Sequence, residues 1–140
     1  MGRLAMVLAV LEARCGLGFG TRDVYLNVAG GLKIVEPGAD LAVAAALLSS
    51  LAEAAAPAGA VFFGEVGLAG EVRAVGQMDA RLKEAAKLGF ERAVMPKSGP
   101  QRRSPGLPTT EIAHLRDLLP LFGLDGARPH RKARAARPVP

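Results

Sequence analysis

The sequence predicts a mixed α+β fold built as one domain. Helix-type and strand-type patterns follow one another along its 140 residues without the regular strand–helix–strand repeat of a doubly wound sheet. A chain of this length buries enough surface for a single core. Half of the residues are hydrophobic, only 4% are aromatic and tryptophan is absent, so alanine, valine and leucine must build that core.

The first expected element is an amphipathic helix over residues 3–15. Apolar side chains recur at steps of three and four residues from Leu4 to Leu11, and Gly16 supplies a stop signal. Because the chain opens directly on a helix, we expect it to be a fragment of a longer protein.

A β-hairpin is expected next. Apolar and polar residues alternate over residues 24–28, and Gly30-Gly31 separates them from the apolar residues 32–35.

A buried helix should follow the turn at Pro37-Gly38. Asp40 is a good N-cap residue, and residues 41–55 carry one charge, Glu53. A helix that is apolar on nearly every face is typical of a protein interior.

Four further elements are predicted before the last third of the chain. Residues 61–64 form a short apolar strand, and residues 64–75 form a glycine-punctuated β segment. Residues 77–88 are a helix, and residues 91–95 are another strand.

A polar, exposed loop is expected over residues 97–108. Thr109 or Thr110 should then cap a last helix over residues 111–119, which three apolar residues attach to the core: Leu118, Leu121 and Phe122.

The net charge of +5 comes from the end of the chain. All 13 acidic residues lie at or before Asp125, whereas five of the 18 basic residues lie after it, which leaves 13 basic residues before that point. We therefore divide the chain into a domain over residues 1–125 and a basic, disordered tail over residues 126–140.

Four segments carry a resemblance to a known family, and their order and spacing agree with it. They are RLAMVLAVLE (residues 3–12), DVYLNVAGG (23–31), GEVGLAGEVR (64–73) and RLKEAAKLGF (81–90). The chain resembles the C-terminal, Lon-protease-like domain of the RadA family of bacterial DNA-repair proteins over about residues 3–97. The resemblance implies a fold similar to domain 2 of ribosomal protein S5, as in the proteolytic domain of Lon.

The same resemblance implies a catalytic dyad position that this chain does not fill. Lon-type proteases use a serine at the start of a buried helix and a lysine base, because a serine hydroxyl attacks only after a base removes its proton. The matching positions here are Ala39 and Asp79. Asp40 should direct its carboxylate at the helix N-terminus, and Lys83 lies one turn beyond Asp79 without a serine to activate. We expect no enzymatic activity from this fragment.

Two basic clusters are candidates for sequence-independent DNA contact. One lies in the exposed loop and the other in the tail, where a solubilising role is an equally good interpretation. Their members are Lys97, Arg102, Arg103, Arg128, Arg131, Lys132, Arg134 and Arg137.

Metal and cofactor sites are not expected in this fragment. Cys15 is the only cysteine, which excludes an internal disulfide and a cysteine-based zinc cluster, and neither His114 nor His130 has a ligand partner at suitable spacing. The resemblance implies that Zn, ATP and Mg belong to the missing parts, a zinc-binding motif and a RecA-like ATPase.

The leading hypothesis is a non-proteolytic scaffold of a branch-migration motor, which assembles a hexameric ring and contacts DNA. The resemblance also implies the RecA recombinase as a partner. The single cysteine favours a reducing, cytoplasmic location, and the apolar stretch over residues 3–14 is too short to span a membrane, so we expect no membrane association. The alternative is a Lon-type serine peptidase with an atypical nucleophile. A structural spacer with neither role is a third hypothesis.

Overall fold

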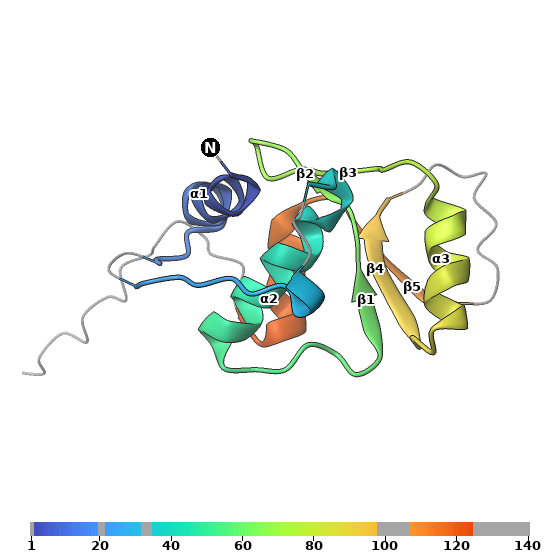
Figure 1. The fold of residues 1–140 in the computed structure, drawn as a ribbon. Helices are drawn as coiled ribbons and strands as arrows, with labels where there is room; N and C mark the ends of the chain where they lie inside the picture. The colour runs from blue at the N-terminus through green and yellow to red at the C-terminus, as the bar shows by residue number, and fades with distance from the viewer. Residues whose placement is uncertain (1, 20–21, 32–34, 98–106, 125–140) are drawn as a thin grey trace, which may run out of the picture.

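A three-stranded parallel sheet organises the protein and carries helices on both faces (Figure 1). The computed structural model describes residues 2–19, 22–31, 35–97 and 107–124. The helices are α1 (Arg3–Cys15), α2 (Asp40–Ala52) and α3 (Met78–Lys87), with 3-10 helices η1 (Ala29–Gly31), η2 (Pro37–Ala39) and η3 (Leu115–Phe122). The strands are β1 (Ala60–Phe62), β2 (Glu65–Val66), β3 (Val72–Arg73), β4 (Arg92–Pro96) and β5 (Thr109–Ile112).

Strand β4 is the centre of the sheet, in the order β1-β4-β5, and both of its neighbours run parallel to it. The path from β1 to β4 passes through the antiparallel hairpin β2–β3 and then through α3. Parallel strands need such a crossover, because a short turn cannot return the chain to the same end of the sheet.

The alternation of side chains along β4 creates two cores. Val94 belongs to the larger core, which α1, α2 and η3 complete. Ala93 and Met95 point the other way into a smaller core, which Leu82 and Ala85 of α3 complete. The sheet therefore separates the α1–α2–η3 layer from α3 (Figure 1).

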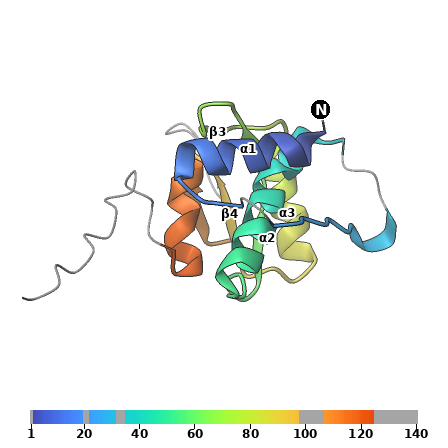
Figure 2. The same cartoon turned by 90° about the vertical axis from the view of Figure 1, so that its left-hand side faces the viewer.

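The two expected N-terminal helices are confirmed. Helix α1 ends where Gly16 adopts a left-handed backbone (φ 65°), and it lies across α2 and η3 (Figure 2). Helix α2 buries seven of its 13 residues. The expected capping role of Asp40 is wrong, because Asp40 is the first helical residue and Ala39 takes the N-cap position without a side-chain cap.

The predicted strand over residues 24–28 is wrong. A strand needs a partner for its N–H and C=O groups, and residues 24–28 pair with no strand in the described part of the chain. Instead this segment runs extended and then turns through η1, where Gly30 has φ 83°. Residues 32–34, most of the second hairpin strand, lie outside the described residues.

The predicted last helix is also wrong at its start. Thr109 and Thr110 belong to β5, where β-branched side chains suit a strand that pairs with β4. The helical turn begins later, because His114 is its N-cap: Nδ1 of His114 accepts the N–H of Arg116 at 3.1 Å. Leu118 and Phe122 are buried and Leu121 packs against the larger core, as expected.

The other predicted elements agree with the structure: β1, the hairpin β2–β3, α3 and β4 all lie within a few residues of their expected positions. Of the loop over residues 97–108 only Lys97, Leu107 and Pro108 are described, and the tail over residues 126–140 lies outside the described residues. Helices and a parallel sheet thus combine in one chain. The specific S5-like arrangement stays a prediction. Among the helices described, none has the length and apolar content needed to cross a bilayer.

Replacing His114 tests the cap of η3. The substitution His114→Ala removes the acceptor of the Arg116 N–H, and a lost N-cap costs about 1 kcal/mol of unfolding free energy. His114→Asn is the matched control, because asparagine is a good N-cap residue and keeps an acceptor there. Urea denaturation of the three proteins measures the effect, and equal stability of wild type and His114→Ala would contradict this account of the cap.

Candidate functional site

Asp40 is the buried polar residue at the N-terminus of α2, with 1% exposure. Both of its carboxylate oxygens accept hydrogen bonds from the guanidinium of Arg3, and Oδ2 also accepts the N–H of Val66 at 3.1 Å. The pKa of Arg3 is raised, mainly because its guanidinium donates these hydrogen bonds to the Asp40 carboxylate. One carboxylate therefore joins α1, α2 and β2.

Glu36 and Arg81 close the other side of the α2 N-terminus. The carboxylate of Glu36 accepts the N–H of Gly38 at 3.1 Å and pairs with the guanidinium of Arg81, from α3, at 2.9 Å. These two hydrogen bonds lower the pKa of Glu36, and the bond from the Gly38 N–H has the larger effect. A Cβ atom at Gly38 would lie 2.9 Å from the Glu36 carboxylate, so a larger residue there would push the Glu36–Arg81 pair aside.

Four successive backbone N–H groups at this helix start are already engaged. The N–H of Gly38 donates to Glu36 Oε1, and that of Ala39 donates to the Glu36 carbonyl. The N–H of Asp40 donates to the carbonyl of Pro37, and that of Leu41 to the carbonyl of Gly64. A serine peptidase needs free donors for its oxyanion, and these four are occupied.

The two expected dyad positions do not meet as a reactive pair. Ala39 has only a methyl group at the α2 N-cap, and Asp79 is exposed on the first turn of α3. Lys83 is also exposed. The described serines on α2, Ser49 and Ser50, lie nine or more residues further along the helix, roughly 14 Å at 1.5 Å per residue.

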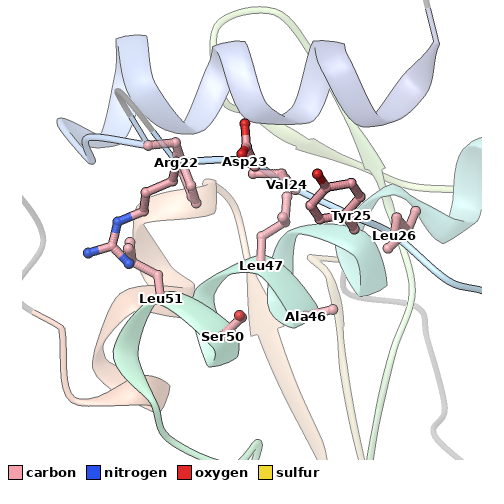
Figure 3. A pocket seen from close by; sticks show the side chains of 10 residues that line it. Arg22, Asp23, Val24, Tyr25, Leu26, Ala46, Leu47, Ser50 and Leu51 are labelled. Atoms are coloured by element: carbon pink, nitrogen blue, oxygen red, sulfur yellow. The ribbon is translucent and has the colours of Figure 1, made fainter.

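A separate pocket of about 210 Å³ lies between the extended segment and the C-terminal half of α2. Figure 3 shows Val24 and Leu47 inside it, with Arg22 at one end and Tyr25 and Leu26 at the other. Tyr25 is 89% exposed, and the lining is mixed, with apolar side chains beside Arg22, Asp23 and Ser50. No hydrogen bond joins Ser50 to Asp23 among the described residues, so the pocket shows no hydroxyl that is paired with a base.

Of the eight predicted DNA-contacting residues, only Lys97 lies in the described part of the structure. It follows β4, its side chain is exposed, and its N–H donates to the carbonyl of Ile112 at 3.1 Å. The other seven lie outside the described residues: Arg102, Arg103, Arg128, Arg131, Lys132, Arg134 and Arg137.

Comparison with known proteins identifies the family. Residues 4–99 match the family model described as subunit ChlI of Mg-chelatase. The chain belongs to this family. In the part that the structure describes, no group of three or more histidine, cysteine or acidic residues gathers at metal-binding distance.

Individual proteins similar to this ChlI-family chain have the name DNA repair protein RadA. The one from Brucella abortus is 54% identical over 127 residues, which cover 90% of the chain and 27% of that protein. Those from Rickettsia bellii and Escherichia coli are 47% and 45% identical and cover 88% and 86% of the chain. The chain spans about a quarter of the length of these relatives. The expected likeness to RadA is confirmed at this level, whereas the Lon-like fold stays a prediction.

The residues that close the α2 N-terminus of this ChlI-family chain were not predicted from its sequence. Arg3 is 37 positions from its partner Asp40, and Glu36 is 45 positions from its partner Arg81. Only the fold brings the members of each pair together. One signal was present: Asp40 is a charged residue in front of an apolar helix, and a buried carboxylate needs a cationic partner.

Removing Arg3 should destabilise the protein more than removing Asp40. Arg3→Met leaves the Asp40 carboxylate buried with only the Val66 N–H as donor, a loss of about 3 kcal/mol, whereas Asp40→Leu leaves a guanidinium that is 35% exposed and can reach water. The double variant should recover much of the loss, because it buries no unpaired charge. Denaturant titrations of the four proteins measure this order, and an Arg3→Met protein as stable as wild type would contradict it.

Proposed function

We propose that this chain is a non-proteolytic module of a RadA-type DNA-repair protein, with a Lon-like, S5-type fold. The repair role is supported by relatives named DNA repair protein RadA, at 54% identity over 90% of the chain for one of them.

The observation that carries the non-proteolytic part is the occupied α2 N-terminus. A peptidase of the Lon type needs a hydroxyl, a base and free oxyanion donors there. This chain has Ala39 at the nucleophile position, an exposed Asp79 at the base position and acceptors on all four N–H groups. The ion pairs of Asp40 and Glu36 make the same region a structural junction.

The module's proposed work is to assemble with its own copies and to present basic surface to DNA. In a ring, each copy holds its neighbours, and exposed lysines and arginines outside the junction neutralise phosphates without reading bases. Lys97 is one such exposed residue. Other parts of the longer protein would bind ATP, Mg and Zn. The assembled protein as a whole would bind RecA.

DNA titrations at several salt concentrations test the DNA-binding part. If all five basic residues after Asp125 contact phosphates, a chain that ends at Asp125 should lose up to about 4.5 units of the slope of log affinity against log salt. An unchanged slope would assign the contact to the body, including Lys97. A full chain that ignores DNA at low salt would refute the DNA-contacting role.

Turnover of an unfolded protein substrate tests the non-proteolytic part. The full chain should show no turnover above buffer, since neither member of the dyad is in place. Turnover that disappears when one serine is replaced by alanine would establish the peptidase alternative instead.

A further inference from the structure

The tip of the β2–β3 hairpin presents an exposed leucine on a rigid turn. Leu68 is 74% exposed. Around it, the N–H of Gly67 donates to the Glu71 carbonyl, the N–H of Gly70 to the Gly67 carbonyl, and the N–H of Ala69 to the Glu71 carboxylate. A Cβ atom at Gly67 would lie 1.7 Å from that carboxylate, so a larger residue there would displace the Glu71 side chain from the turn.

The rest of the protein also holds this tip in place. His114 Nε2 donates to the Ala69 carbonyl at 2.9 Å, and the N–H of Leu115 donates to the Gly70 carbonyl at 2.8 Å. Arg14, from the last turn of α1, reaches the Leu68 carbonyl at 3.4 Å. Because the turn is already held by these bonds, a partner that covers Leu68 would order little additional backbone.

An apolar groove of about 260 Å³ lies on the other side of the sheet, between α3 and β1. Two charged residues, Arg81 and Glu84, line it together with five apolar ones: Val61, Phe63, Ala85, Leu88 and Phe90. Leu88 is 68% exposed and Phe90 37% exposed. The four carbons of a leucine side chain fit within this space.

The charges beside the tip and the groove are complementary. At the hairpin, Glu71 pairs with Arg73, and in the groove Arg81 pairs with Glu36. Arg14 beside the tip and Glu84 beside the groove take part in no ion pair among the described residues. A contact that seats Leu68 in the groove of another copy would bring these two unpaired charges to the same interface.

We infer that Leu68 of one copy docks into the α3–β1 groove of the next, with Arg14 of the first facing Glu84 of the second. The hairpin tip lies near α1 (Figures 1 and 2), and α3, whose residues line the groove, lies on the opposite side of the sheet (Figure 1). The contact is therefore heterologous, and it repeats from copy to copy into a ring or a filament. This inference rests on the proposed assembly role and names its contact surface.

Cysteine cross-linking tests the pairing. A mixture of Leu68→Cys and Leu88→Cys chains should form a disulfide-linked dimer under mild oxidation, and either variant alone should not. A chain with both substitutions should form a ladder of dimers, trimers and larger species. Wild type is the control for the buried Cys15, and Tyr25→Cys, on a different surface, is the control for random collision. A mixture that cross-links no more than Tyr25→Cys overturns the inference.

Charge reversal separates this contact from assembly in general. By light scattering over a concentration series, Arg14→Glu and Glu84→Arg should each weaken association at least about tenfold, and the double variant should recover most of it. If both single variants assemble like wild type, this contact is refuted and the proposed assembly stands. If wild type is monomeric at every concentration, the proposed assembly fails as well. Loss of DNA binding on Leu68→Asp, with unchanged mass, would assign the tip to DNA and also overturn the inference.

Discussion

The buried carboxylate of Asp40 is the constraint on which the arrangement of the larger core depends. A charged group with 1% exposure is tolerated only where donors surround it, and here Arg3 and the N–H of Val66 supply them. Arg3 can reach Asp40 only if α1 lies across the start of α2, and Val66 can reach it only if β2 passes beside the same turn. The relative positions of three elements thus follow from the needs of one side chain.

Local signals predicted the helices and strands whose ends are set by their own residues. Gly16 ends α1 in a left-handed conformation, and the apolar run of α2 gives a buried helix, as the patterns indicate. Whether a segment pairs as a β-strand depends on residues far away in the sequence. The alternation over residues 24–28 is real, but among the described residues no neighbouring backbone accepts its hydrogen bonds. Thr109 and Thr110 suit either a helix start or a strand, and the adjacent edge of β4 decides for the strand.

In the candidate site too, local residue types could be predicted from the sequence, whereas contacts between distant segments could not. The residue types at Ala39 and Asp79 are visible in the sequence, and they suffice to predict that a serine–lysine pair is lacking. What fills the place of that pair is not visible, because Glu36 and Arg81 come from segments 45 positions apart. The capping role expected of Asp40 failed for a related reason: the carboxylate that bonds Gly38 is that of Glu36, and Asp40 is occupied by more distant donors.

Closing a helix N-terminus in this way changes what the region can contribute to a function. Backbone N–H groups that stabilise an oxyanion must be free until the reaction begins, whereas those of Gly38, Ala39, Asp40 and Leu41 are bonded in the resting structure. Opening them would separate Glu36 from Arg81 and disturb the junction beside Asp40. The same bonds join α1, α2, α3 and β2, so this region is a structural junction, whereas the Leu68 side chain and the α3–β1 groove are exposed and available for contact.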